Sequence, residues 1–178
     1  WAMATSDGQQ VGSGLALDAG GHLYSHALLW SGTAESCVDL NPSGFDSSSA
    51  QDVSGGKQVG YGHGPATGAP HALLWSSTPE SYIDLNPGSG GSMARGVSGN
   101  QQVGGWESSA TGGVYYAALW SGSAGSHVSL NPTGFSSLAI AASGGQQVGY
   151  AQRKISSKLW DKSHAFLWSG SAESYVDL

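Results

Sequence analysis

The chain repeats itself four times, and this repetition limits its fold more than any other feature of the sequence. The tripeptide Gln-Val-Gly begins at positions 10, 58, 102 and 147, so successive copies lie 44 to 48 residues apart. A repeat of this length is typical of one four-stranded blade of a β-propeller. A tryptophan and a leucine recur in the same phase, at Trp30, Trp75, Trp120 and Trp168 and at Leu40, Leu85, Leu130 and Leu178.

Each repeat contains four segments with the composition of β-strands. The first is rich in small residues, as at 50–54, and ends in a two-residue turn such as Gly55-Gly56, which accepts the positive φ angles of a tight hairpin. The second strand contains Gln-Val-Gly, and the third ends at the repeat tryptophan. In the first three repeats the fourth strand ends before Asn-Pro, because proline cannot continue a strand ladder.

The third strand of the second repeat is apolar on both faces. His71, Leu73 and Trp75 share one face, and Ala72 and Leu74 share the other. A sheet that is apolar on both faces packs between two neighbours. We therefore predict an all-β fold, a β-propeller of four tandem four-stranded antiparallel blades, closed as a ring of four or part of a larger ring. The single domain divides into blades at about 1–48, 49–92, 93–137 and 138–178.

Composition excludes several classes of protein. Seven Trp and seven Tyr at regular positions argue against disorder. The formal net charge of -6 argues against a nucleic-acid partner, since such proteins usually carry a basic face. No apolar run approaches the ~20 residues of a membrane span. Cys37 is the sole cysteine, and we expect it to be a buried apolar side chain.

The repeat segments resemble a known family. HALLWSG, HAFLWSG, SGGQQVGY and VDLNPSGF are similar to the bacterial HAF extracellular repeats, and the similarity covers nearly the whole chain. The resemblance implies an extracellular or cell-surface propeller and assigns no catalytic residue. The third repeat departs from the pattern, because Tyr116 replaces the histidine of HALLW.

Histidine and aspartate recur together in three repeats, at His26, His71 and His164 and at Asp39, Asp84 and Asp177. The third repeat replaces both, with Tyr116 and Ser129. This paired change predicts a structural His–Asp contact inside each blade. The alternative is a ring of ligand or metal contacts. We expect no metal site and no cofactor, because the histidines lack tight ligand spacing.

The candidate ligand-binding residues lie in or beside the connections between second and third strands, whose sequences vary most. These connections are 14–25, 63–70, 108–115 and 152–163, and equivalent connections of a propeller emerge on one face. The repeat tryptophans we assign to packing between blades rather than to sugar stacking. The candidates are Trp106, Arg153, Lys154, Lys158, Trp160 and Lys162.

No catalytic motif is present: GxSxG, HExxH, the P-loop and the dinucleotide fingerprint are all missing. The sequence therefore favours a non-enzymatic, extracytoplasmic binding module for a glycan or a protein. An alternative is a structural protein that self-assembles, as a homo-oligomer or with further blades of a longer chain. A polysaccharide-acting enzyme is a third hypothesis, for which the sequence shows no asymmetric cluster of polar residues.

Overall fold

The computed structural model describes residues 1–17, 21–64, 68–107, 113–155 and 161–178. It contains four antiparallel sheets of four strands, each built by one repeat with its strands in chain order. The predicted all-β fold is thereby confirmed. No helix of the described residues is long and apolar enough to cross a membrane.

The four sheets are called units 1 to 4. Unit 1 contains β1 (Ala2–Ser6), β2 (Gln9–Leu17), β3 (Leu23–Trp30) and β4 (Val38–Asp39). Unit 2 contains β5 (Ser47–Ser54), β6 (Lys57–His63), β7 (Pro70–Trp75) and β8 (Ile83–Asp84). Unit 3 contains β9 (Ser92–Ser98), β10 (Gln101–Trp106), β11 (Tyr116–Trp120) and β12 (Val128–Ser129). Unit 4 contains β13 (Phe135–Ser143), β14 (Gln146–Arg153), β15 (His164–Trp168) and β16 (Val176–Asp177).

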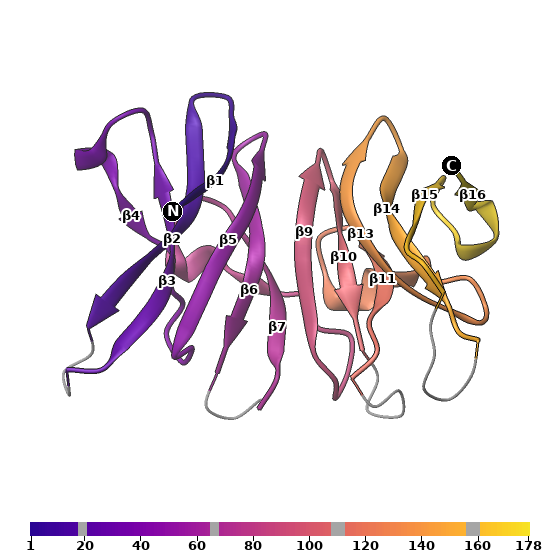
Figure 1. The fold of residues 1–178 in the computed structure, drawn as a ribbon. Coiled ribbons are helices and arrows are strands. Elements are labelled where there is room, and N and C mark those ends of the chain that lie inside the picture. Colours follow the sequence, from indigo (N-terminus) through magenta and orange to yellow (C-terminus); the bar gives the residue numbers. More distant parts are fainter. Residues whose placement is uncertain (18–20, 65–67, 108–112, 156–160) are drawn as a thin grey trace.

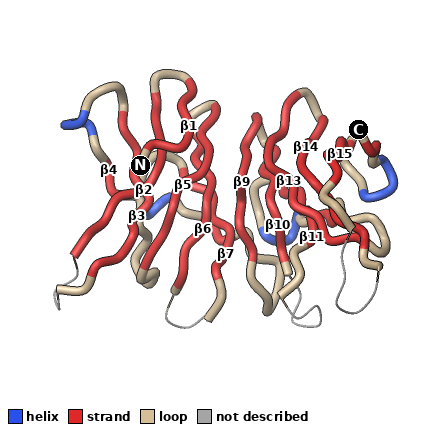
Figure 2. The backbone as a smooth tube through the Cα atoms, in the orientation of Figure 1, coloured by secondary structure: helices blue, strands red, loops and turns tan. Residues whose placement is uncertain are grey.

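The units stand side by side in chain order, with unit 1 and unit 4 at opposite ends of the row (Figure 1). The first strands β1, β5, β9 and β13 contact one another in sequence. The turns between first and second strands lie along the upper edge of Figure 1, and the second strands end along the lower edge. Figure 2 shows that the only helical segments of the described chain are short. They are the 3₁₀ turns η1 (Ala34–Ser36), η2 (Pro79–Ser81), η3 (Ala124–Ser126) and η4 (Ala172–Ser174).

Packing between neighbouring units forms the core. We call the face of a unit that meets the next unit its leading face, and the opposite one its trailing face. The leading face of unit 2 carries Val59, Ala72, Leu74 and Leu85, and it packs on the trailing face of unit 3 around Trp120. Equivalent clusters join units 1 and 2 around Trp75, and units 3 and 4 around Trp168. The predicted inter-unit packing of these three tryptophans is confirmed, since all are fully buried.

The glycine of Gln-Val-Gly is required by a β-bulge in the first strand. In unit 2 the pairing of β5 with β6 shifts between Ala50 and Asp52, which leaves Gln51 as the extra residue. The bulge brings the Ser49 carbonyl against Gly60, where a Cβ atom would overlap the carbonyl oxygen. The same overlap would occur at the equivalent glycines, Gly12, Gly104 and Gly149.

The glutamine of the same tripeptide ties two turns together. Gln58 is fully buried; its Nε2 donates to the Gly56 carbonyl at 3.0 Å, and its Oε1 accepts from the Ser77 amide at 2.7 Å. Gly55 and Gly56 have φ angles of +57° and +75°, as the hairpin turn predicts. The buried amide thus satisfies backbone groups that the turns leave unpaired.

Several boundaries and environments differ from the predictions. The first strands of units 2 to 4 begin at Ser47, Ser92 and Phe135, ahead of the starts at 50, 94 and 139 that the small residues predict. In unit 1, β2 and β3 stay paired as far as Leu17 and Leu23, so most of the predicted 14–25 connection is strand. Cys37 is exposed rather than buried, because it follows η1 at the edge of the unit.

Gly60→Ala tests the bulge. The new methyl group meets backbone rather than a yielding side chain, so we expect a loss of about 2–4 kcal/mol in stability and a fall of at least about 4 °C in Tm. The matched control is Gly125→Ala in η3, where a Cβ meets no atom within 4 Å. Thermal unfolding followed by circular dichroism measures both; equal Tm values for the two variants would contradict the account.

Candidate functional site

The repeated histidines and aspartates are paired in the three units that contain both. His26 Nδ1 lies 2.7 Å from Asp39 Oδ2, His71 Nδ1 2.7 Å from Asp84 Oδ2, and His164 Nδ1 2.9 Å from Asp177 Oδ2. The predicted His–Asp contact is therefore confirmed. In each unit the third strand supplies the histidine and the fourth strand the aspartate.

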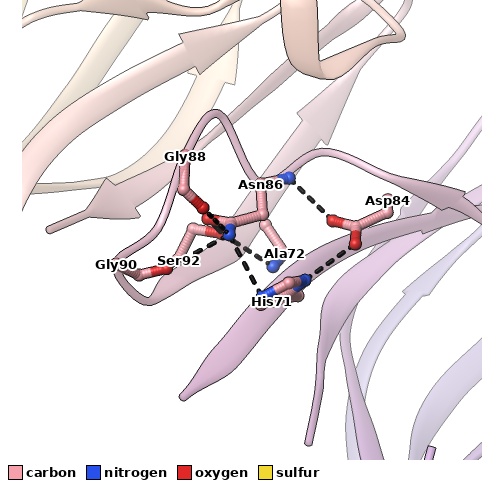
Figure 3. Close-up of polar contacts among 7 residues, drawn as sticks. All are labelled: His71, Ala72, Asp84, Asn86, Gly88, Gly90 and Ser92. Carbon is pink, nitrogen blue, oxygen red and sulfur yellow. Dashed lines mark hydrogen bonds and ion pairs between the residues drawn. The ribbon is translucent and has the colours of Figure 1, made fainter. Parts of the chain in front are cut away.

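In unit 2 this pair belongs to a larger polar network (Figure 3). The Asn86 amide N–H donates to Asp84 Oδ1 at 2.8 Å, and Asn86 Nδ2 lies 3.1 Å from His71 Nε2. Ser92 Oγ of β9 donates to Asn86 Oδ1 at 2.8 Å and accepts from the Ala72 amide at 3.0 Å. The network therefore anchors the first strand of unit 3 to the third strand of unit 2.

Serine, histidine and aspartate lie close together here, but they are not arranged for nucleophilic catalysis. A catalytic serine donates its hydroxyl proton to the histidine that acts as its base. Ser92 donates instead to the Asn86 side chain, and its side chain is fully buried. Ser48 and Ser137 repeat the same link to Asn41 and Asn131, as expected of an architectural element.

Trp106 has a half-buried side chain. It ends β10, and its ring centroid lies 4.7 Å from that of His127 in an edge-to-face contact. The indole Nε1 and His127 Nε2 are both buried and have no hydrogen-bond partner among the described residues. Burial lowers the pKa of His127, so the imidazole is neutral at pH 7.

The predicted basic segment is only partly described. Arg153 ends β14, and Arg153, Lys154 and Lys162 are exposed. Lys158 and Trp160 lie outside the described residues. Gln152, the residue before Arg153, lines a pocket.

The feature that sequence reasoning missed is Arg95, the extra residue of the bulge in β9. Its Nη1 donates to Gln51 Oε1 at 2.9 Å, its Nη2 contacts the Met93 sulfur at 3.1 Å, and its guanidinium carbon lies 5.9 Å from the Tyr61 ring centroid. Nε is buried with no hydrogen-bond partner among the described residues. No carboxylate in the described part of the chain forms an ion pair with Arg95.

Arg95 lines two pockets, which together we call the Arg95 cleft. One pocket, of about 460 Å³, is lined by residues of units 1 to 3 that include Ser49, Gln51, Tyr61 and His63. The other, of about 430 Å³, lies between units 3 and 4 and is lined by Tyr115, Ser136, Tyr150, Gln152 and others. Burial, followed by the charge of Glu107, raises the pKa of Tyr115, so its phenol stays protonated.

A signal for Arg95 is present in the sequence. The bulge residues of the four units are Met3, Gln51, Arg95 and Ile140, and only one of them is charged. The sequence alone does not show that residue 95 differs in orientation from the small residues on either side of it in the first strand. Recognising it requires the register of β9 against β10.

No group of three or more potential metal ligands occurs among the described residues. No protein-family model matches the chain, and no curated protein gives a significant match. The similarity of the repeat segments to the HAF family stays a prediction. The Arg95 cleft must therefore be interpreted from its own chemistry.

Asp84→Ala tests the His–Asp contact. The change removes the acceptor of both His71 and the Asn86 amide. We therefore expect a loss of about 1–2 kcal/mol in the free energy of unfolding and a fall of about 2–6 °C in Tm. The control uses the residue types that unit 3 has at these two positions, Tyr and Ser. In a His71→Tyr background, Asp84→Ser should lower the free energy of unfolding clearly less than it does in the wild-type protein. Equal costs in both backgrounds would show that the pair is not coupled.

His127 predicts a pH dependence. The fold lowers its pKa below the unfolded value of 6.5, so its stabilising contribution is complete above pH 6.5 and is lost as the pH falls towards the folded pKa. The wild-type protein should lose stability between pH 7 and 5 more steeply than His127→Phe, by at most about 1.4 kcal/mol per pH unit. Urea unfolding at each pH measures this difference. Parallel profiles for the two proteins would refute it.

Proposed function

We propose that this chain is a non-enzymatic binding module with β-propeller architecture that acts outside the cytoplasm and binds a carboxylated glycan in the Arg95 cleft. The observation that carries the proposal is a guanidinium that lines two pockets and has no carboxylate partner in the described chain. Extracytoplasmic action rests on the resemblance of the repeats to the HAF family.

The propeller architecture is supported by the way in which the units stack. Four-stranded antiparallel sheets pack face to face in chain order, and their first strands adjoin one another. Successive propeller blades are arranged in this manner around a central axis. On this view the bulge residues, Arg95 among them, lie towards the axis.

A carboxylate is the ligand group that best matches Arg95. The guanidinium is planar, permanently charged and suited to bidentate hydrogen bonds with a carboxylate. Two of its nitrogens already contact Gln51 and Met93, which holds the side chain in place before a ligand arrives. Pre-organisation of this kind reduces the entropy lost on binding.

The rest of the cleft suits a sugar. Tyr61, Tyr115 and Tyr150 supply aromatic faces and phenol groups, and Ser49 and Ser136 add hydroxyl groups. Because the pKa of Tyr115 is raised, its phenol remains available as a hydrogen-bond donor at alkaline pH. A sugar acid presents both the carboxylate and the hydroxyl groups that such a surface recognises.

The cleft favours binding over hydrolysis. Glycoside hydrolases generally use two carboxyl side chains that flank the scissile bond. Among the residues that the structure describes, neither pocket is lined by an Asp or a Glu. The exposed side chains of Arg153 and Lys154, next to Gln152 at the rim, raise the positive potential there and favour the approach of an anionic ligand.

Arg95→Gln tests the proposal by isothermal titration with oligogalacturonate, an oligosaccharide of uronic acids. We expect about 10- to 100-fold weaker binding, since a hydrogen-bonded charge contributes about 1.5–3 kcal/mol. The control variant is Lys57→Gln, which removes one positive charge from a side chain that contacts Asn100 at 3.2 Å and lines neither pocket. Its affinity should equal that of the wild-type protein.

The carboxyl-reduced form of the same oligosaccharide is the control ligand, and the wild-type protein should bind it no better than Arg95→Gln binds the acid. Equal affinity for the acidic and the reduced ligand would overturn the assignment of a carboxylate. Absence of binding to either oligosaccharide would refute the proposal of a glycan ligand and would favour a protein ligand. Thermal melts of both variants confirm that they are folded.

A further inference from the structure

The interfaces between neighbouring units follow one rule. The leading face of units 1, 2 and 3 presents the same four residue types, Val, Ala, Leu and Leu, and all are buried against the next unit. In unit 1 they are Val11, Ala27, Leu29 and Leu40. One kind of leading face thus meets one kind of trailing face three times in the chain.

Unit 4 has the same leading face, and no other unit of the described chain packs on it. Its residues at the equivalent positions are Val148, Ala165, Leu167 and Leu178. Val148 is 43% exposed and Leu178 is 73% exposed, whereas Val11 and Leu40 are fully buried. A pocket of about 150 Å³, lined by Ala141, Val148 and Leu167 among others, opens on this face.

Unit 1 has the complementary trailing face, also without a neighbour. Ala2, Thr5, Leu28 and Trp30 stand at the positions of Ala50, Val53, Leu73 and Trp75 in unit 2. The four residues of unit 2 are buried against unit 1. In unit 1, Ala2 and Thr5 are exposed and Leu28 and Trp30 are only half-buried.

A polar contact repeats across two of the internal interfaces as well. Gln58 Nε2 donates to Gln9 Oε1 at 3.1 Å between units 2 and 1, and Gln147 Nε2 donates to Gln101 Oε1 at 3.3 Å between units 4 and 3. The equivalent residues on the two end faces are Gln10, on the trailing face of unit 1, and Gln146, on the leading face of unit 4.

We infer that the leading face of unit 4 docks on the trailing face of unit 1 of a second copy of this chain. The interface continues the three internal ones, with Trp30 of one copy against Val148 and Leu167 of the other, and Gln10 beside Gln146. Such a head-to-tail contact uses different surfaces on the two partners. It therefore either closes into a ring or continues as a filament, according to the angle between units.

Val148→Glu tests the inference by sedimentation velocity across a range of protein concentrations. The wild-type protein should form a closed ring or a filament, and Val148→Glu, with a charge at the centre of the leading face, should be monomeric. The matched control is Ile83→Glu, at a residue that is 42% exposed in the internal unit 2. It should assemble like the wild-type protein.

A wild-type protein that stays monomeric at the highest concentration would overturn the inference. So would assembly that Val148→Glu leaves intact, because association would then use another surface, such as the exposed Leu15, Leu17 and Leu23. Thermal unfolding of each variant separates loss of assembly from loss of fold.

Disulfide trapping provides an independent test of the register. Gln10→Cys and Gln146→Cys are combined in a Cys37→Ser background, which removes the one native thiol. Oxidation should link separate chains in high yield. Moving the second cysteine to Gln101, which already faces Gln147, is the control and should reduce the yield at least tenfold; equal yields would contradict the proposed docking.

Discussion

Burial of the repeat tryptophans of units 2, 3 and 4 beneath the preceding unit is the interaction on which the fold depends. A four-stranded sheet that is apolar on both faces cannot bury either face alone, so each unit requires neighbours. Trp75, Trp120 and Trp168 fill the three internal interfaces against the same set of small and branched side chains. Stability therefore resides between the units more than within them, and the end faces are the places where this packing is incomplete.

Polar repeat residues hold the units in a fixed register. The buried Gln58 joins the first hairpin turn to the loop after β7, and Ser92 with Asn86 joins the start of unit 3 to unit 2. Each of these groups satisfies backbone amides or carbonyls that the irregular connections leave unpaired. The glycine of Gln-Val-Gly admits the bulge, and the bulge turns one extra side chain per unit out of the ladder.

Features that recur in three or four of the repeats were predictable from the sequence, and features of single units were not. The ends of the third strands, the two apolar faces of β7 and the His–Asp contact recur with the period and are present in the structure. Cys37 was placed wrongly, because exposure after a short 3₁₀ turn depends on packing that composition does not reveal. Arg95 was missed because its direction depends on the register of the bulge.

We propose that the repeats build the scaffold and that Arg95, the one charged bulge residue, provides the binding site. Hydrogen–deuterium exchange with and without oligogalacturonate tests it most directly, since it locates the ligand without any substitution. We expect slower exchange in β9, which carries Arg95, and in the other segments that line the Arg95 cleft, namely β5, β6, residues 113–115, the start of β13 and β14. Unchanged exchange in these segments, or protection confined to other parts of the chain, would contradict it.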